Sequence, residues 1–230
     1  MKKIQRYFFY IIAIWCAMCL FLRCYMNMAG MQTGRTAGDG NVELTGSIGQ
    51  TNNAPFFLVF QDDQSEDSYE VREKLITPDV DIRVGFSDRF DLGLTMSIAK
   101  FGLTSKYNIF NYRDKFSMAG GLSAGHAIGG KYFQAQLFAS IHPTEKMAIY
   151  CNPTYSLALL SKYSSTTFFT DNLDFYGANI GFLYGSKTQL GVDVGVYTMA
   201  ADSKEYAMLQ LGIGVKFLFG DKQKAEKIEY

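Results

Sequence analysis

The stretch GFSDRFDLGLTM, residues 85–96, places a short charged link between two segments in which large apolar residues alternate with small or polar ones. After the link, Leu92, Leu94 and Met96 fall on one side of the alternation. A period of two is typical of a β-strand whose two faces meet different surroundings. The stretch therefore predicts a hairpin whose turn is Asp88-Arg89. Which strand face meets water decides between a soluble barrel and a membrane barrel.

The same period recurs along the chain, and no convincing helical periodicity appears from residue 41 onward. The alternating segments are 41–50, 76–87, 90–100, 102–110, 115–126, 132–142, 146–160, 173–185, 188–199 and 206–219. Transmembrane strands need about 9–11 residues, and single-chain bacterial barrels contain an even number of them. The pattern predicts an all-β fold, a transmembrane up-and-down antiparallel β-barrel of about ten strands.

The connections between these segments alternate in length, although two on the longer side, at 100–102 and 127–131, are also short. Short links lie at 88–89, 111–114, 143–145 and 186–187, whereas longer ones lie at 51–75, 161–172 and 200–205. Short periplasmic turns and longer outer loops are typical of outer-membrane barrels. Since unpaired strand edges are costly in lipid, we expect strand 41–50 to close the barrel against strand 206–219.

The composition of the less apolar face of the strands indicates whether that face meets bulk water or a confined barrel interior. It carries mainly Gly, Ser, Thr, Asn and Gln with few charges, whereas a water-exposed face is normally rich in Lys and Glu. Small residues suit the confined interior of a ten-stranded barrel, so the apolar face is expected to meet lipid. The alternative is a secreted, soluble, lipocalin-like binding barrel with its apolar face inward.

Aromatic residues cluster beside the short turns, as expected of an interfacial girdle. They are Phe86, Phe90, Phe110, Phe116, Tyr184, Phe217 and Phe219. On the opposite face the sequence predicts a set of lumen-lining charges, which must be paired or hydrated. These are Glu43, Asp79, Asp81, Arg83, Asp91, Lys106, Asp193 and Lys216. Strand pairing makes Lys216 and Arg83 candidate partners of Glu43.

The N-terminus is interpreted as a targeting segment. A basic start precedes an apolar run over residues 7–22, which is short for a membrane-spanning helix and suits a signal peptide. We expect a signal peptide over 1–24, a periplasmic linker over 25–40, the barrel over 41–219 and a charged periplasmic tail over 220–230. A retained anchor helix is the alternative, and Cys24 is a candidate for lipidation.

The catalytic and metal-binding patterns in the sequence are incomplete. Residues 121–125 match G-x-S-x-G, but Ser123 lies within an alternating strand, and the acid and histidine that should follow it in order are missing. His126 and His142 lack metal-ligand spacing. We therefore expect no enzyme activity, no metal and no cofactor. A net charge of +0 gives no electrostatic basis for binding nucleic acid.

A family resemblance adds to this interpretation. The segment QTGRTAGDGNVEL, residues 32–44, resembles the start of a group of small Gram-negative outer-membrane β-barrel proteins, in which a QTxRTxGxGNxE motif follows the signal peptide, often just after a lipidated cysteine. GFSDRFDLGLTM is similar to their first short turn and LGIGVKFLFG, residues 211–220, to their closing strand. The group is largely without assigned activity, so the resemblance implies fold and location and names no substrate.

The functional expectation is an outer-membrane barrel with a structural or interaction role and a mostly filled lumen. The alternative within the same fold is a passive pore or a transporter of small amphiphiles, which the Gly-rich inner face favours. Expected partners are outer-membrane lipid and the export and barrel-assembly machinery. These patterns do not specify an oligomeric state.

Overall fold

The computed structural model describes residues 31–55, 72–97, 100–112, 115–127, 130–160, 172–201 and 204–220. The expected signal peptide 1–24 with Cys24, and the tail beyond Gly220, lie outside the described residues. The strands are β1 (Val42–Pro55), β2 (Arg72–Ser87), β3 (Phe90–Ser97), β4 (Lys100–Tyr112), β5 (Phe116–Ala127), β6 (Gly130–Thr144), β7 (Met147–Leu160), β8 (Leu173–Gly185), β9 (Thr188–Ala201) and β10 (Lys204–Phe219). In this described part, no helix is long and apolar enough to cross a membrane.

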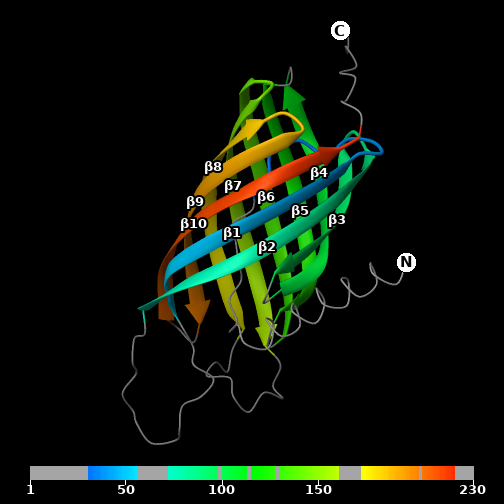
Figure 1. The fold of residues 1–230 in the computed structure, drawn as a ribbon. Coiled ribbons are helices and arrows are strands. Elements are labelled where there is room, and N and C mark those ends of the chain that lie inside the picture. Colours follow the sequence, from blue (N-terminus) through cyan, green and yellow to red (C-terminus); the bar gives the residue numbers. More distant parts are fainter. Residues whose placement is uncertain are drawn as a thin grey trace, which may run out of the picture.

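The strands form one closed antiparallel barrel in which each strand pairs with its sequence neighbours. The first and last strands complete the cylinder, with a register that runs from Val42 opposite Phe219 to Asn52 opposite Leu209 (Figure 1). Closure gives every strand a partner on both sides, so no strand edge is left for lipid to cover. The predicted all-β, up-and-down, ten-stranded barrel and its closing pair are confirmed.

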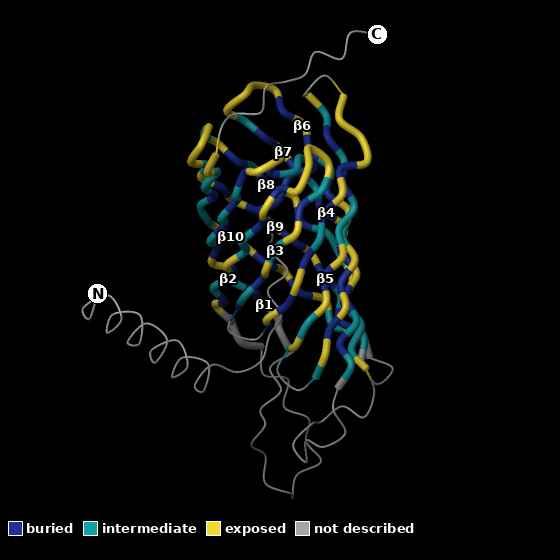
Figure 2. Tube along the Cα trace, turned by 90° about the vertical axis from the view of Figure 1, so that its right-hand side faces the viewer, coloured by how far each residue is buried: buried dark blue, intermediate teal, exposed yellow. Residues whose placement is uncertain are grey.

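The two faces of the wall differ as the sequence predicts for a membrane barrel. Buried and exposed residues alternate along the strands (Figure 2). Apolar side chains point outward, and Leu103, Leu122 and Leu190 are 68%, 66% and 65% exposed. A soluble barrel would not present a continuous apolar surface of this extent to water. The structure thus has the opposite orientation to the lipocalin-like alternative.

Aromatic residues lie at the end of the barrel that holds the short turns, called the turn end. Phe86 and Phe90 lie 6.5 Å apart between ring centroids, and Phe217 and Phe219 lie 6.2 Å apart. A second group of outward-facing aromatics, not predicted from the sequence, lies toward the opposite, loop end: Phe101, Phe133, Tyr155 and Tyr176.

The spacing of the two aromatic groups fits a membrane. Tyr176 and Tyr184 are both exposed on β8, and eight residue steps separate them, about 27 Å of strand. A strand tilt of about 40° reduces this length to about 20 Å along the barrel axis, close to the apolar band of about 25 Å in outer-membrane barrels. The aromatic groups therefore bracket a layer of membrane thickness.

Two local features refine the predicted strands. Lys100, predicted to end the third strand, begins β4 instead. Pro153, a residue type that usually marks a bulge or a break in a strand, lies in an unbroken β7 and keeps its register with Ala178 of β8. On the β6 side, strand pairing stops at Gln136–Thr154 and resumes at Ala139–Cys151 with no change of register. The proline therefore interrupts one ladder without adding a residue.

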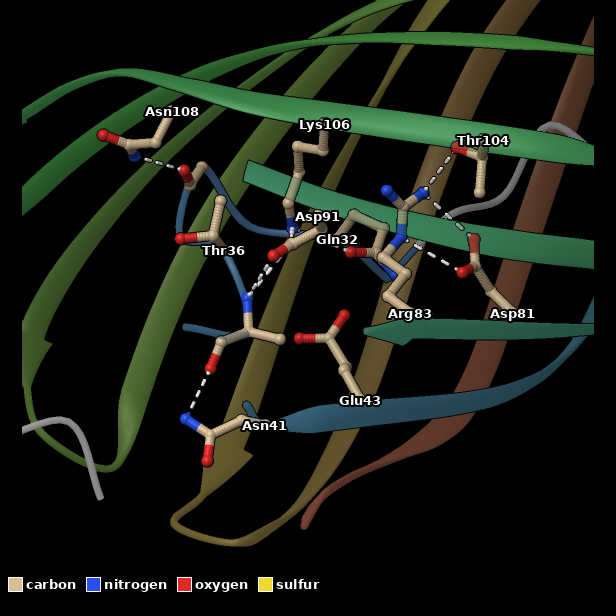
Figure 3. Close-up of polar contacts among 12 residues, drawn as sticks. Gln32, Thr36, Asn41, Glu43, Asp81, Arg83, Asp91, Thr104, Lys106 and Asn108 are labelled. Atoms are coloured by element: carbon tan, nitrogen blue, oxygen red, sulfur yellow. Dashed lines mark hydrogen bonds and ion pairs between the residues drawn. The ribbon is translucent and has the colours of Figure 1, made fainter. Parts of the chain in front are cut away.

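The described part of the predicted periplasmic linker lies inside the barrel and not outside it in the periplasm. Residues 31–40, called the plug segment from here on, lie inside the barrel at its turn end and contact inward-facing side chains of several strands (Figure 3). Met31, Gln32, Thr33 and Ala37 are all at least 94% buried. The reason is polar complementarity, since a short backbone segment can use the amide and carboxylate groups that the inner wall offers.

Candidate functional site

The plug segment is held through its backbone by side chains of the barrel wall. The Asn152 amide of β7 donates a hydrogen bond to the Gln32 carbonyl at 3.0 Å. The Asn108 amide of β4 donates to the Gly34 carbonyl at 2.7 Å. The Gly34 N–H in turn donates to Ser140 Oγ of β6 at 3.0 Å. Three strands thus supply to the plug the partners that a buried backbone requires.

Gly34 also explains how the plug lies so close to the wall. A Cβ at this position would overlap the backbone carbonyl of Ser117 on β5. Asn108 bonds to Ser117 Oγ at 3.0 Å as well as to Gly34, so its amide ties the plug to both strands. A larger residue in place of Gly34 would have to move the plug backbone away from β5.

The plug joins β1 through a tight glycine turn. Gly38 and Gly40 have φ values of 86° and 68°, which disfavour residues with a Cβ. The Asn41 N–H donates to the Gly38 carbonyl at 3.1 Å, and the Gly40 N–H donates to the Gly85 carbonyl at 3.0 Å. This turn reverses the chain at the mouth of the barrel, so that the plug returns into the lumen instead of continuing along β1.

Asp91 and Lys106 form the charged part of the contact with the plug. Both carboxylate oxygens of Asp91 accept the Ala37 N–H, at 3.1 and 3.0 Å. Lys106 Nζ lies 3.7 Å from the Asp91 carboxylate and donates to the Gln32 side-chain carbonyl at 3.3 Å. Neither charged side chain has any exposed surface. A buried pair of this kind is stable only while both charges keep their partners.

A second pair closes the seam between β1 and β10. Lys216 Nζ lies 3.0 Å from the Glu43 carboxylate, so the predicted contact between them is present. Arg83, the other predicted partner, lies opposite Glu43 in the ladder of β1 and β2. Its guanidinium instead contacts Asp81, with Nε 3.0 Å from the carboxylate, and donates to Thr104 at 3.1 Å.

The remaining predicted charges lie farther along the lumen. Asp193 accepts hydrogen bonds from the Tyr150 hydroxyl at 3.2 Å and from the Asn179 amide at 3.0 Å. Asp79 is half-buried on β2, toward the loop end, opposite Ser97 of β3. Most of the predicted set therefore gathers in the turn half, where Glu43 interacts electrostatically with Arg83, Lys106 and Lys216 (Figure 3). Asp79 and Asp193 lie apart from that group.

Aromatic side chains occupy much of the lumen beside these charges. Two cations lie over the Phe138 ring, with Arg83 Cζ 5.9 Å and Lys106 Nζ 5.6 Å from its centroid. Cations at this distance from a ring face are attracted by its quadrupole. Phe138 is 1% exposed, so it fills space in the lumen and also contacts the buried charges.

The inner-face glycines make room for these rings. A Cβ on Gly121 would lie 2.6 Å from the Phe138 ring. A Cβ on Gly181 would overlap the Tyr150 ring, and one on Gly102 would overlap the Tyr132 hydroxyl. The Gly-rich inner face, which the sequence analysis connected with a pore, therefore accommodates large inward side chains.

The loop half of the lumen is filled differently. Its buried cluster consists of Tyr132, Ala158, Phe175, Tyr197, Met199 and Met208. Lys100 Nζ lies 5.6 Å from the centroid of the Tyr132 ring. Here large apolar side chains from the successive strands β6 to β10 pack together, and the plug segment takes no part in the cluster.

Sequence reasoning missed the residues that hold the plug. Gln32, Gly34, Asn108, Ser140 and Asn152 carry most of its polar contacts. A signal was present, since Asn108 and Asn152 are amides at inward positions of their strands, where two donors and an acceptor need partners. The sequence does not show that the linker supplies those partners.

The residues of the apparent catalytic and metal-binding patterns lie at positions that fit a structural role. Ser123 lies within β5, and the strand continues past it. His142 is buried at the turn end, with a ring nitrogen 3.0 Å from Ser140 Oγ, so it supports the serine that contacts the plug. His126 is exposed near the loop end. Among the described residues, no group of three His, Cys, Asp or Glu side chains could hold a metal ion.

Comparison with known proteins finds similar barrels and no family. No protein-family model matches the chain, and no curated protein sequence matches it. Among solved structures, the NanC porin is 9% identical with a TM-score of 0.46, over 76% of this chain and 98% of its own. Neisserial surface protein A is 12% identical with a TM-score of 0.41, over 79% and 100%. Ail, the attachment invasion locus protein of Yersinia pestis, is 10% identical with a TM-score of 0.34, over 79% and 99%.

The wall itself establishes where the barrel resides. It is closed, antiparallel and up-and-down, its outer face is apolar, and aromatic residues lie toward both ends. These are the features of the transmembrane barrels of outer membranes, in which lipid meets the outer face and a polar interior is enclosed. The protein is an outer-membrane β-barrel.

Proposed function

We propose that this barrel is not an enzyme and serves a structural or interaction role, with its lumen closed by its own plug segment. The observation that supports this role is the set of hydrogen bonds with the plug backbone, in which Asn108 and Asn152 donate and Ser140 and Asp91 accept. Each buried backbone contact replaces water that a conducting path would need. Outer-membrane lipid and the export and barrel-assembly machinery are the proposed partners.

Two further features support a filled lumen. The rings of Phe138 and Tyr150 cover inner-face glycines that would otherwise widen the lumen. The plug residue Met31 packs with Ala148, Tyr150 and Leu183 in a second buried apolar cluster. Polar contacts and apolar packing thus act on the same segment, so releasing it would break both.

A passive pore or a transporter of small amphiphiles is the second candidate. The observation that favours it is the apolar cluster of the loop half, since Phe175, Met199 and Met208 offer an apolar surface inside the lumen. Methionine side chains adapt to ligands of different shapes. In this case the plug would have to move whenever a solute crosses the turn half.

Planar-bilayer recording of the purified full-length protein separates the two candidates. We expect the native chain to show no stable ohmic conductance. The Gly34→Val variant should conduct, because its side chain would overlap the Ser117 carbonyl and displace the plug from β5. Gly46→Val is the matched control, since a Cβ at Gly46 meets nothing within 4 Å.

Stable conductance of the native chain would overturn the closed-lumen proposal. Swelling assays on reconstituted vesicles extend the test to uncharged solutes. Permeation by small sugars, or lipid that co-purifies and is identified by mass spectrometry, would favour the pore or amphiphile transporter instead. A folded Gly34→Val variant that stays silent would show that the plug is not what closes the lumen.

A further inference from the structure

A cavity of about 680 Å³ lies at the turn end of the barrel, between the plug segment and the inner wall. Thr33 and Arg35 of the plug line one side of it. Glu43 and Lys216 of the closing seam line the other, and turn residues surround its mouth. Its size is in the range of ordinary small-molecule sites, which measure about 300–1,000 Å³. None of the functions proposed above uses this cavity.

Three turn lysines contribute to the lining from equivalent positions. Each lysine directly precedes a strand: Lys115 precedes β5, Lys146 precedes β7 and Lys187 precedes β9. All three are exposed. The Lys115 carbonyl accepts the His142 N–H at 2.7 Å, and the Lys146 carbonyl accepts the Gly185 N–H at 2.8 Å.

The third lysine repeats this contact, because the Lys187 carbonyl accepts the Leu218 N–H at 2.8 Å. Each of these turns is therefore fastened by its backbone to the next hairpin. The fastening fixes where the lysine Cα atoms lie, while the long side chains stay adjustable. Lysine ammonium groups on fixed anchors can follow an anion of variable shape.

The charge around the cavity is unbalanced. Lys216 is neutralised by Glu43 at 3.0 Å, and the three turn lysines add further positive charge. Among the described residues that line the cavity, the other carboxylate is Glu145. The chain as a whole has a net charge of +0, so this excess is local. Cations gathered around a concave, partly desolvated space raise the local concentration of anions.

We propose that this cavity, called the turn-end cavity, binds a small soluble anion that carries two or more phosphate or carboxylate groups. The Thr33 hydroxyl lines the same space and can donate to such groups, whereas the Thr36 hydroxyl already donates to the Asp88 carbonyl at 2.6 Å. A soluble anion fits better than a lipid headgroup because the lining comes from the plug, the inner wall and the turns. Acyl chains would lie against the opposite, outer face of the wall.

A fourth turn provides an internal control. Arg89 follows β2, and its carbonyl accepts the Asn108 N–H at 2.8 Å, as the lysine carbonyls do for their neighbours. Arg89 is exposed but does not line the cavity. If cations at the turns served only to meet lipid headgroups, Arg89 and the lysines would behave alike.

Isothermal titration calorimetry on the full-length protein in zwitterionic detergent tests the proposal. The probes are tripolyphosphate, citrate and the uncharged sugar trehalose. We expect binding of at least one anion, weakened by added salt, and no binding of trehalose. The Lys146→Gln/Lys187→Gln double variant should bind about three- to tenfold more weakly, since it loses two partly solvated charge contacts. Tripolyphosphate and citrate together distinguish phosphate from carboxylate chemistry.

The matched control is Arg89→Gln/Lys131→Gln, which removes two exposed charges that do not line the cavity. It should bind the anion as the native chain does. An equal loss in both double variants, equal binding of trehalose, or no binding of either anion would overturn the proposal. Flotation with phosphatidylglycerol vesicles in the absence of anion binding would assign the lysines to lipid instead. The proposal goes beyond the closed-lumen role, because a conducting barrel could still pass this test.

Discussion

The two halves of the lumen are filled by different means. In the turn half, the chain returns on itself and inserts a segment whose backbone needs hydrogen-bond partners, and the wall supplies Asp91, Asn108, Ser140 and Asn152. In the loop half, Phe175, Tyr197, Met199 and Met208 come from the wall itself and pack together. The same barrel therefore contains one polar, segment-filled half and one apolar, self-filled half.

The difference indicates which half can change state. The plug can leave as a unit, because its hydrogen bonds are each exchangeable for water at modest net cost and must be broken together with the packing of Met31. A cluster of side chains fixed to a closed wall has no such route, since its backbone is locked in the ladders. We therefore expect charge and amide substitutions to affect the turn half selectively, and cavity-creating substitutions to affect overall stability.

The largest effect is expected from Lys106→Met. This change leaves Asp91, which has no exposed surface, without its cation. Removing one member of a buried pair typically costs about 3–5 kcal/mol. Urea unfolding of the detergent-solubilised barrel should show this loss. The exposed Lys131 provides the control, because Lys131→Met should change the free energy of unfolding by less than about 0.5 kcal/mol.

The double variant Lys106→Met/Asp91→Leu sharpens the same measurement. If the cost arises from the uncompensated Asp91 charge, removing that charge should recover part of the stability that the single variant loses. The recovery is incomplete, because the Ala37 N–H also loses its acceptor. Additive losses in the double variant would show that the pair is not energetically coupled.

In the loop half, Met208→Ala should cost about 2–3 kcal/mol, because Met208 is 2% exposed and its truncation leaves a cavity. Amide hydrogen exchange at Gly34 and Ala37 should stay at its native rate, since Met208 belongs to the other half of the lumen. Faster exchange in the plug of this variant would mean that the two halves are coupled, contrary to the comparison.

Asn108→Ala should show the reverse pattern. It removes donors to Gly34 and Ser117, and we expect a loss of about 1–2 kcal/mol with faster exchange at Ala37. Gln136→Ala is the control, because this amide bonds to Thr154 of the neighbouring strand. Native exchange at Ala37 in Asn108→Ala would remove the amide from the set that holds the plug.

The sequence specifies the barrel wall far better than it specifies what fills the lumen. Alternation in stretches such as residues 209–219 follows directly from the period of a strand, and closure follows from the cost of an open edge in lipid, so strand number and the β1–β10 pair are predictable. The contact of Glu43 with Lys216 follows from that pairing. Strand ends are less well predicted, as Lys100 shows, because hydrogen bonding can continue past the alternating residues.

There is a physical reason why the position of the plug could not be predicted from the sequence. Its contacts run from backbone groups of Gln32, Gly34 and Ala37 to side chains 54 to 120 residues away. Backbone groups are the same at every position, so the linker carries no residue pattern that distinguishes solvation by water from solvation by Asn108 or Asn152. Only the folded wall brings those amides to one place.

The smallest effect is expected from removing one hydroxyl group in the loop half. Within the described part of the chain, Tyr132 Oη is buried with no hydrogen-bond partner, so Tyr132→Phe should change the free energy of unfolding by less than about 0.5 kcal/mol or should stabilise slightly. Tyr150→Phe is the matched change beside the plug, where the hydroxyl donates to Asp193 at 3.2 Å. Losing that charge-assisted bond should cost about 1–3 kcal/mol. Equal costs for the two variants, measured by the same urea unfolding, would contradict the division between an apolar half and a polar half. The pair tests that division directly, because both substitutions delete the same atom from a buried ring and differ only in what the hydroxyl contacts.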